Sequence, residues 1–540
     1  MTRLRWPSRW DPVGIVLLGA ALFLPGLGAR DLWNPDEPRY AEVTREMLTS
    51  GDYLVPHLNG AVYQQKPPLL FWSMAAAAKL TGGLDEVAAR LPSALAAVGA
   101  LLLTFLLGRQ ELGRRAAWIA FLVLGTGVKF FWQARVGQID MLLVFVVTLA
   151  VVCWWRGELT RDGRWALLFF AVSGLATLAK GPAGFLPPLL AILALYAWER
   201  DREGWRRLHL GWGLVVWAAV VAAWLLPAAA RAGGDYLVTL VWKQNVTRYA
   251  DPWGHHRPWW YFLGVLPLDF FPWSFLLPGA IVAAWRRLRG PEGRFLRFLL
   301  CWAAVTLVFF SLSPGKRTVY ILPMYPALAL LIGAAFDAWA ARRSRQRRWL
   351  SRPLAVLTGS LTLVALALPW TVERRPEAAL FPGWLSPTLT VLAGVAAATA
   401  GLALLLARRG RVVAVASALA AGMAAVWMAL LILVLPLFDR VKSARPLAST
   451  YLELARDDEP YATYPRLDAP FLFYTRRLAV PLANETALHR FARLPGRQWL
   501  FIEREDLLGL RQPLPLMEVA RDPEPREGYV LMTDPPALSP

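Results

Sequence analysis

The sequence predicts an all-α polytopic membrane protein that ends in a soluble α/β domain. Hydrophobic residues make up 56% of the 540 residues and charged residues only 18%, so the chain is more apolar than an average soluble domain. Apolar runs of about 17 to 25 residues recur along it, which is the length that a helix needs to cross a hydrocarbon core. These runs stop after residue 437, and a segment of ordinary soluble composition follows.

Hydropathy predicts about thirteen membrane-spanning helices. The first is expected to be an uncleaved span, because it is long and no small-residue cleavage pattern follows it. The predicted spans are 12–29, 89–108, 116–134, 139–155, 165–179, 182–198, 210–230, 259–285, 295–312, 319–340, 350–370, 385–407 and 412–437.

The connections between these spans alternate in charge, and this alternation predicts the topology. One set is short and rich in arginine, as in RQELGRR at 109–115 and ARRSRQRR at 341–348. Such connections usually face the cytoplasm, and Arg3, Arg5 and Arg9 then place the N-terminus there too. The pattern accounts for most of the net charge of +20, so no nucleic-acid partner is expected. Other cations are available to anionic membrane lipids.

Residues 438–540 are expected to form the soluble domain. Strand-like pieces such as QWLFIE at 498–503 and YVLMTD at 529–534 alternate with helical stretches, which is typical of an α/β domain. The span count places this domain on the exoplasmic side. Two domains are therefore expected, one at 1–437 in the membrane and one at 438–540 outside it.

The first exoplasmic loop, residues 30–88, is the expected front wall of a functional site. It is longer than ordinary connections, and it is expected to contain amphipathic helices along the membrane surface. Asp36 and Glu37 stand near its start, and Lys66 precedes two prolines. Asp36 fits two roles: it is either a helix N-cap or a carboxylate that accepts a proton from an attacking hydroxyl.

Several cations fall on the same predicted side as this loop, against the usual topological bias. They are Lys66, Lys180, Arg257, Lys316 and Arg317. Together they predict an anionic ligand, and phosphate suits both ion types because Arg binds it in a planar fork and Lys as a point charge. Tyr320 can add a phenolic hydrogen bond. Anchoring to lipid head groups is the alternative role.

Asp140 and a pair of histidines complete the set of polar candidates. Asp140 lies where one predicted span ends and the next begins, with Arg135 five residues upstream. It is either part of an interfacial ion pair or a functional carboxylate, since ionisable residues at this depth are often functional. His255 and His256 are possible metal ligands, but no third ligand stands near them in the sequence.

The loop motif WNPDEPRYAEVTREMLTSGDYLVPHLNGAVYQQKPPLLFW at 33–72 resembles the first exoplasmic loop of bacterial aminoarabinose transferases. Those enzymes are type-C glycosyltransferases, as are the protein O-mannosyltransferases. Weaker similarities follow in the same order: ARVGQIDM (134–141), LAKGPAGF (178–185), HHRPWWYF (255–262) and SPGKRTVYILPMYP (313–326). The resemblance covers the whole chain. It implies the type-C glycosyltransferase fold, in a bacterial inner membrane, with a periplasmic C-terminal domain.

The resemblance also implies a reaction. The donor is a sugar joined through one phosphate to a polyprenol, usually undecaprenol, and the acceptor is a lipid A-like or other periplasmic molecule that receives the sugar with inversion. The predicted catalytic residues are Asp36, Glu37 and Asp140. The predicted ligands of the donor phosphate are Lys66, Arg257, Tyr320, Lys180 and Lys316. The predicted substrate contacts are Arg39, Tyr63 and Gln65.

Three alternatives stay open from the sequence. Some relatives have Glu before the Lys of the KPP motif, close to a metal near the histidines. Gln65 stands at that position here, and an amide is a poor metal ligand, so a divalent metal at His255 and His256 stays an alternative. The acceptor is alternatively a protein or a cell-surface polymer. From another class, the alternative is a polyprenyl-lipid transporter whose Asp36 and Asp140 bind the cargo.

Overall fold

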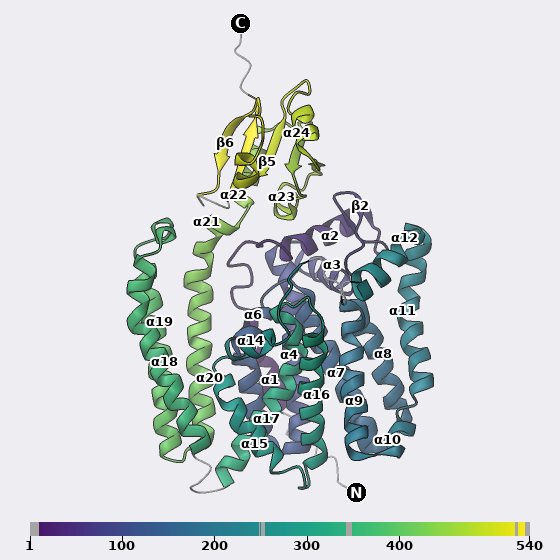
Figure 1. Cartoon of the computed structure of the whole chain (residues 1–540), viewed down its shortest axis with the longest axis vertical. Helices are drawn as coiled ribbons and strands as arrows, with labels where there is room; N and C mark the ends of the chain where they lie inside the picture. The colour runs from purple at the N-terminus through teal and green to yellow at the C-terminus, as the bar shows by residue number, and fades with distance from the viewer. Residues whose placement is uncertain (1–9, 248, 250–253, 342–347, 524–527, 535–540) are drawn as a thin grey trace.

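The helices of the membrane part stand side by side, and the first loop and a small sheet cover one end of them (Figure 1). The computed structural model describes residues 10–247, 249, 254–341, 348–523 and 528–534. Within these ranges nine helices are long and apolar enough to cross a membrane, or ten if one bent pair is a single span. The arginines predicted to be cytoplasmic at positions 3, 5, 9, 342, 343, 345 and 347 lie outside the described residues.

The long apolar helices of the first 442 residues coincide with predicted apolar runs, and shorter helices lie between them. In chain order they are α1 (Trp10–Phe23), α2 (Glu37–Ser50), α3 (Leu69–Thr81), α4 (Glu86–Leu112), α5 (Arg114–Thr126), α6 (Val128–Gln133), α7 (Ile139–Thr160), α8 (Gly163–Lys180), η1 (Gly181–Gly184), α9 (Leu186–Glu199), α10 (Arg202–Arg207), α11 (Leu210–Ala232), α12 (Gly234–Leu237), η2 (Val238–Thr247), α14 (Tyr261–Asp269), η3 (Trp273–Leu276), α15 (Leu277–Trp285), α16 (Gly293–Leu312), η4 (Thr318–Met324), α17 (Tyr325–Ala341), α18 (Arg348–Glu373), η5 (Pro376–Leu380), α19 (Leu385–Arg408), α20 (Val412–Ala429), η6 (Leu430–Val434), η7 (Leu435–Phe438) and α21 (Asp439–Lys442).

Some predicted spans are not single straight helices. The segment predicted as one span over 259–285 consists of α14 and the helical stretch from Trp273 to Trp285, which bend by 112°. Pro272 stands at the break, and proline ends a helix because it lacks a backbone donor. The helices α1 and α9 are apolar but shorter than 18 residues. A mostly helical membrane protein is confirmed, whereas the count of thirteen spans stays a prediction.

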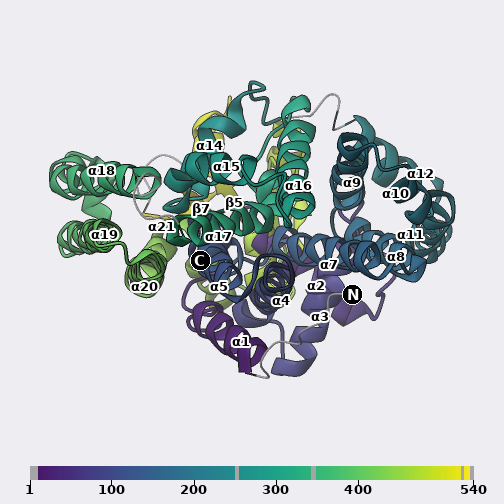
Figure 2. The same ribbon diagram turned by 90° about the horizontal axis from the view of Figure 1, so that it is seen from below.

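The centre of the bundle consists of α4, α5, α7 and α17, which pack against one another (Figure 2). The helices α8 to α11 lie on one side of this centre and α18 to α20 on the other. Many alanines of α4 and α17 are fully buried, and small residues let helix backbones approach closely within a membrane. Large buried side chains such as Trp154 and Trp302 fill the remaining space.

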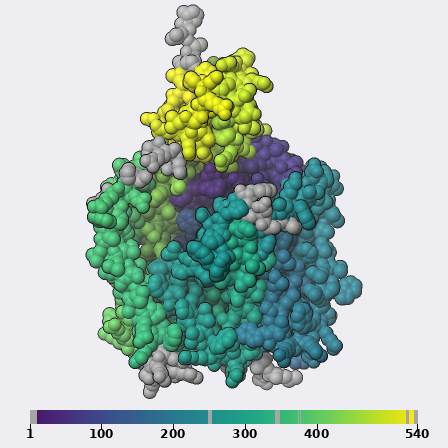
Figure 3. All heavy atoms as spheres, viewed as in Figure 1, coloured from purple at the N-terminus to yellow at the C-terminus, as the bar shows by residue number. Residues whose placement is uncertain are grey.

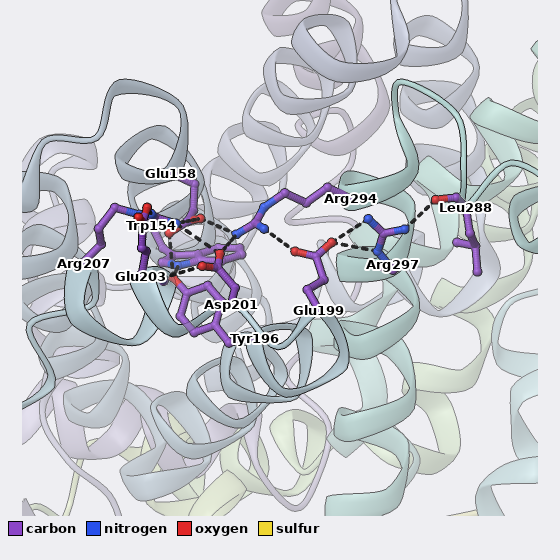
Figure 4. Close-up of polar contacts among 11 residues, drawn as sticks. Trp154, Glu158, Tyr196, Glu199, Asp201, Glu203, Arg207, Leu288, Arg294 and Arg297 are labelled. Carbon is purple, nitrogen blue, oxygen red and sulfur yellow. Dashed lines mark hydrogen bonds and ion pairs between the residues drawn. The ribbon is translucent and has the colours of Figure 1, made fainter.

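An ion-pair network joins several helices (Figure 4). One of them, α10, lies at the end of the bundle opposite the C-terminal sheet (Figure 1). Arg294 of α16 donates to Glu158 of α7 at 2.5 Å and to Asp201 at 2.9 Å, and it also pairs with Glu199 at the end of α9. Arg207 of α10 contacts Glu158 and Asp201, both at 3.2 Å. Each carboxylate of this cluster therefore has more than one cationic partner or hydrogen-bond donor.

The C-terminal residues form a mixed five-stranded sheet with helices. Its strands are β3 (Tyr461–Tyr464), β4 (Val480–Pro481), β5 (Trp499–Glu503), β6 (Met517–Arg521) and β7 (Tyr529–Thr533), in the order β4-β3-β5-β7-β6. β3 is parallel to β4 and β5, whereas β7 is antiparallel to β5 and β6. The helices are α22 (Arg445–Leu454), α23 (Ala469–Thr475), α24 (Glu485–Phe491) and α25 (Arg504–Leu508). The domain boundary at residues 437 and 438 stays a prediction.

The first loop fills the space between the helices and this sheet (Figure 3). After α2 it forms a hairpin of β1 (His57–Leu58) and β2 (Ala61–Val62). The turn residue Asn59 exchanges two hydrogen bonds with the backbone of Ala479, at 3.0 and 2.8 Å. The helix α23 packs on α2. The C-terminal domain thus contacts the element that begins at the predicted catalytic residues.

Candidate functional site

Asp36 occupies the N-cap position of α2, but its carboxylate makes no capping hydrogen bond. Instead, its Oδ2 atom accepts hydrogen bonds from Arg317 Nη2 at 2.8 Å and from Gln138 Nε2 at 3.2 Å. Arg39 Nη1 lies 3.9 Å from Oδ1. Burial disfavours the charge of Arg317, but Asp36, together with Asp140 and Tyr40, outweighs this effect and raises the pKa of the guanidinium. The Asp36 carboxylate therefore points toward Arg317 and Gln138 and not toward the backbone amides of its own helix.

Glu37 points in another direction, into a buried cluster of cations. Its carboxylate accepts hydrogen bonds from Arg30 Nη1 at 2.7 Å, from Arg90 Nε at 2.7 Å and from the amide of Gly137 at 2.9 Å. Burial alone would raise the pKa of Glu37, yet the two guanidiniums hold it at about 2. A Cβ at Gly137 would lie 2.9 Å from the Ala89 carbonyl oxygen, so only glycine brings this amide so close. These contacts favour a structural role for Glu37.

Asp140 lies in the first turn of α7 and pairs with Lys180 at the end of α8. The alternative ion pair with Arg135 is not formed, because Arg135 donates to the carbonyl of Leu22 at 2.8 Å. Lys180 Nζ also lies 4.7 Å from the ring centroid of Tyr320, a cation–π distance. The structure thus brings together three residues that the sequence places far apart.

A cavity of about 420 Å³ opens beside this group. Lys66, Lys180 and Tyr320 line one part of it, together with the polar side chains of Asn245 and His255. The remaining wall is largely apolar and includes Leu186, Phe309 and Phe310. Gly181, with φ +67°, directly follows Lys180, and a Cβ there would lie 2.2 Å from Asn245 Oδ1. Such a cavity offers cations to a phosphate and an apolar surface to its hydrocarbon chain.

Arg257 and Lys316 lie in a second, more polar cavity of about 300 Å³. Their segments run side by side: the Arg257 amide donates to Pro314 at 3.0 Å, and the Lys316 amide donates to His255 at 3.0 Å. Lys316 Nζ donates to the carbonyls of Arg257 and Ser313, and burial lowers the pKa of this ammonium. Lys316 therefore holds two segments together. Arg317, which binds Asp36, lines the same cavity.

The remaining predicted residues do not form a metal site. His255 lines both cavities, and His256 pairs with Gly315 in a short antiparallel bridge. Gln65 is exposed. Among the described residues, no group of three or more His, Cys, Asp or Glu side chains is placed to hold a metal ion. The donor set does not fit the divalent metal that the resemblance allowed.

Of the predicted substrate contacts, Arg39 is nearest to the site, 3.9 Å from Asp36. Tyr63 is buried and packs edge-on against Phe71, within the core of the first loop. Two residues of the site were not singled out from the sequence: Gln138, which binds Asp36, and Gln133, which binds Gln138. Uncharged amides give no electrostatic signal, although Gln138 stands inside the motif at 134–141.

Comparisons with known proteins agree with this geometry. Residues 13–230 match the family model of dolichyl-phosphate-mannose-protein mannosyltransferases. The chain is 35% identical over 404 residues to an undecaprenyl phosphate-alpha-4-amino-4-deoxy-L-arabinose arabinosyl transferase of Pseudomonas aeruginosa, covering 72% of this chain and 71% of that protein. A relative with the same name from Edwardsiella ictaluri is 31% identical, with 67% and 66% covered. The chain thus spans just under two thirds of the Edwardsiella protein.

Among solved structures, the chain is similar to ArnT from Cupriavidus metallidurans bound to undecaprenyl phosphate. The TM-score is 0.83 with 25% sequence identity, and 98% of each chain is covered. The likeness thus includes both the membrane helices and the C-terminal sheet. It confirms the fold that the first-loop motif implied, that of a membrane glycosyltransferase. The chain therefore belongs to the family of bacterial undecaprenyl phosphate-aminoarabinose arabinosyl transferases, within the type-C glycosyltransferases.

Proposed function

We propose that this protein transfers a sugar from a polyprenyl phosphate donor, with undecaprenyl phosphate as the carrier, to a lipid A-like acceptor. The observation that carries the proposal is the position of Asp36. Its carboxylate is held by Arg317 and Gln138, residues that line one cavity, beside a second cavity in which cations adjoin an apolar wall. Aminoarabinose transferases are named for such a donor.

The donor occupies the partly apolar cavity. Lys66 and Lys180 face its phosphate, Tyr320 adds a hydroxyl, and the polyprenol lies along Phe309 and Phe310. As the sugar leaves, the electrons of the bond between the anomeric carbon and phosphate oxygen stay with the phosphate. The cations stabilise this new charge best when they are positioned in advance in a partly dry site. Lys316, whose ammonium binds two backbone carbonyls, instead shapes the segment that carries Arg317.

The acceptor approaches from the side of Asp36. Its nucleophilic oxygen forms a bond to the anomeric carbon as the bond to phosphate breaks, which inverts that carbon. If the nucleophile is a hydroxyl, its proton passes to Asp36 as the general base. An ionised phosphate needs no deprotonation, and Asp36 then orients the sugar. Asp140 holds Lys180 toward the donor phosphate.

We further propose an orientation of the protein in the bacterial inner membrane. The N-terminus is cytoplasmic, thirteen spans follow, and the C-terminal sheet lies in the periplasm with the first loop. The arginine-rich connections support this orientation. A reporter fused after residue 440 is expected to be periplasmic, and a cytoplasmic signal there would refute the orientation.

The decisive test is Asp36→Asn in the purified full chain, assayed with undecaprenyl phosphate-4-amino-4-deoxy-L-arabinose and lipid A. Turnover is expected to fall by roughly 10²-fold or more, whether Asp36 acts as the general base or orients the sugar. The matched control is Asp52→Asn in the same loop. Asp52 accepts from the local amides of Leu54 and Val55, as an asparagine side chain also does, and its 3.5 Å ion pair is with an exposed arginine. Turnover of this control is therefore expected to stay normal.

A second variant tests the donor site. Lys66→Ala is expected to weaken donor binding by more than about tenfold, since losing one partner of a partly buried ion pair costs several kcal/mol. Equal donor affinity in Lys66→Ala and the unmodified protein would refute the assignment of Lys66.

The alternative acceptor is a membrane or periplasmic protein in place of lipid A. The match to the protein mannosyltransferase model supports this alternative. Mass spectrometry of both products distinguishes them.

A further inference from the structure

Two glutamines form a chain of hydrogen bonds that ends at Asp36. Gln133, the last residue of α6, is fully buried. Its Nε2 atom donates to Gln138 Oε1 at 2.6 Å, and Gln138 Nε2 donates to Asp36 Oδ2 at 3.2 Å. Both side chains line the more polar cavity. These hydrogen bonds therefore connect the end of α6, through Gln138 at the N-cap of α7, to the Asp36 carboxylate.

The direction of these bonds is set by the Asp36 carboxylate, which only accepts. An amide has one end that donates and one that accepts. Because Gln138 turns its donor toward Asp36, its oxygen faces Gln133, which meets it with a donor. If Gln138 were turned around, its carbonyl oxygen would face the Asp36 carboxylate, and two acceptors would repel. The Gln133 amide thus supports the orientation in which Gln138 donates to Asp36.

The consequence concerns the two oxygens of Asp36. Oδ2 accepts from both Arg317 and Gln138, at 2.8 and 3.2 Å. Arg39 Nη1 lies near Oδ1, at the longer distance of 3.9 Å. Oδ2 therefore has two short hydrogen bonds from fixed donors, whereas the longer contact at Oδ1 is one that a substrate can replace. A rotation of the carboxylate about its bond to Cβ would exchange these environments, and both donors oppose it.

We propose that Gln133 and Gln138 form an amide relay that orients Asp36 and presents its Oδ1 atom to the substrate. Both glutamines are positioning residues, because they act through Asp36. The effect on the reaction rests on the proposed function, whereas the relay itself can be tested without turnover.

The kinetic experiment compares Gln133→Met with Gln133→Glu in the full chain. Methionine has a similar length but no donor, so Gln138 Oε1 loses the hydrogen bond that holds the amide in place, and kcat is expected to fall several-fold. Glutamate has nearly the same shape but only accepts, and the cations of the cavity, Lys129, Arg257, Lys316 and Arg317, keep it ionised. Gln138 then turns its donor toward the introduced carboxylate and its oxygen toward Asp36. Here kcat is expected to fall by about fiftyfold or more, with the donor KM unchanged within twofold.

The control is Gln110→Glu, which makes the same chemical change at an exposed position of α4. Its kcat is expected to equal that of the unmodified protein. The inference is overturned if Gln133→Met lowers kcat as much as or more than Gln133→Glu, or if the donor KM rises in parallel with the loss. If the unmodified protein shows no sugar transfer at all, the proposed function fails, and the relay is judged on stability alone.

The stability experiment is a double-mutant cycle between positions 133 and 36. Gln133→Glu is expected to lower Tm by several degrees when Asp36 is present and by less than half of that in the Asp36→Asn background, because an asparagine can donate to the reversed Gln138. Additive shifts in Tm would overturn the relay. If Gln133→Glu does not fold, Gln133→Met takes its place in the cycle, and coupling with Asp36→Asn is again expected.

Discussion

Asp36 and Glu37 are adjacent in the chain, yet their environments give them opposite roles. The N-cap geometry of α2 turns Asp36 toward Arg317 and Gln138, whereas Glu37 enters a buried pocket with Arg30 and Arg90. A buried charge is tolerated only with close partners. Glu37 has three donors, which join the first loop, α4 and the segment before α7. The carboxylate next to the catalytic candidate thus fixes the backbone on which Asp36 stands.

Glu37→Gln tests this structural role. The change leaves two buried guanidiniums without their counter-ion, so the free energy of unfolding is expected to fall by about 3–5 kcal/mol. Because the pKa of Glu37 is lowered to about 2, its contribution is fully present above its ordinary pKa near 4.3 and is lost as pH falls toward 2. Thermal unfolding at pH 5 and pH 8 should therefore show the same loss.

The control for Glu37 is Glu203→Gln, since the Glu203 side chain is 75% exposed. Its ion pair with Arg207 is a surface pair, worth about 0–1 kcal/mol. A loss of stability in Glu37→Gln no larger than in Glu203→Gln would show that the buried cluster does not depend on Glu37.

Asp468 in the C-terminal domain has the opposite pH dependence. It caps α23 by accepting from the Phe471 amide at 2.9 Å, and burial raises its pKa to about 6. The folded state then prefers the neutral acid, so stability is highest below the ordinary pKa near 3.9 and falls as pH rises to about 6. At about 1.36 kcal/mol per unit, the difference is about 3 kcal/mol.

Asp468→Asn is expected to remove this pH dependence, because asparagine still caps the helix but carries no charge. At pH 7.5 the strands β5 and β7 should exchange amide hydrogens more slowly in Asp468→Asn than in the unmodified protein, whereas at pH 4.5 the two should be nearly equal. Asp457→Asn is the control, since that side chain is fully exposed. Faster exchange in Asp468→Asn at pH 7.5 would contradict the expectation.

At the scale of elements, the sequence predicts the helices better than their meeting points. Apolar runs gave the positions of α4, α7, α16 and α19 within a few residues, because the length of a span is set by the bilayer. The same runs did not predict the 112° bend after α14, since hydropathy carries no information about direction. The two strand-like pieces at 498–503 and 529–534 coincide with β5 and β7 because their β-branched and aromatic residues favour extended backbone.

The sequence predicts that the charged residues of the candidate site lie on one side of the membrane. It does not predict which of them contact one another. Which cation meets which carboxylate depends on how distant helices pack, so the pairing of Asp140 with Lys180 had no signal in the spacing. Lys316 was expected at the phosphate, yet its ammonium binds two carbonyls. Gln133 was overlooked because a neutral side chain in an apolar helix gives no pattern.

The ion-pair network around Arg294 is expected to stabilise the relative positions of α7, α9, α10 and α16. Arg294→Gln removes the cation that joins three carboxylates. Hydrogen bonds to charged groups contribute about 1.5–3 kcal/mol each, but Arg207 and Arg297 remain as partners. A total loss of about 2–4 kcal/mol is therefore expected in thermal unfolding, against no measurable change in the exposed control Arg289→Gln. Equal unfolding temperatures in the two variants would contradict this role.

At the scale of the whole molecule, the C-terminal domain is tied to the first loop directly before Asp36. The Leu32 amide donates to the Tyr474 hydroxyl at 2.7 Å, and the Asp31 amide donates to Asp439 at 3.1 Å. Arg445 pairs with Asp31 at 2.8 Å and also with Glu86 at the start of α4. The segment that enters α2 is thus held from two sides, by the membrane helices and by the sheet.

Arg445→Ala tests whether this attachment matters for the proposed reaction. The variant removes the Arg445 ion pairs with Asp31 and Glu86 and leaves the neutral donors Ser443 and Tyr474 on these carboxylates. Neither cavity is touched, and the loop segment at 30–36 should exchange amide hydrogens faster. Because a displacement of about 1 Å at a catalytic group can cost roughly a hundredfold, kcat is expected to fall by about tenfold or more. The affinity for undecaprenyl phosphate should stay constant, since Lys66, Lys180 and Tyr320 are held by other elements.

The control is Arg477→Ala, which breaks an ion pair within the domain and should leave kcat unchanged. A normal kcat in Arg445→Ala together with faster exchange at 30–36 would show that the domain attaches to the loop without setting the position of Asp36.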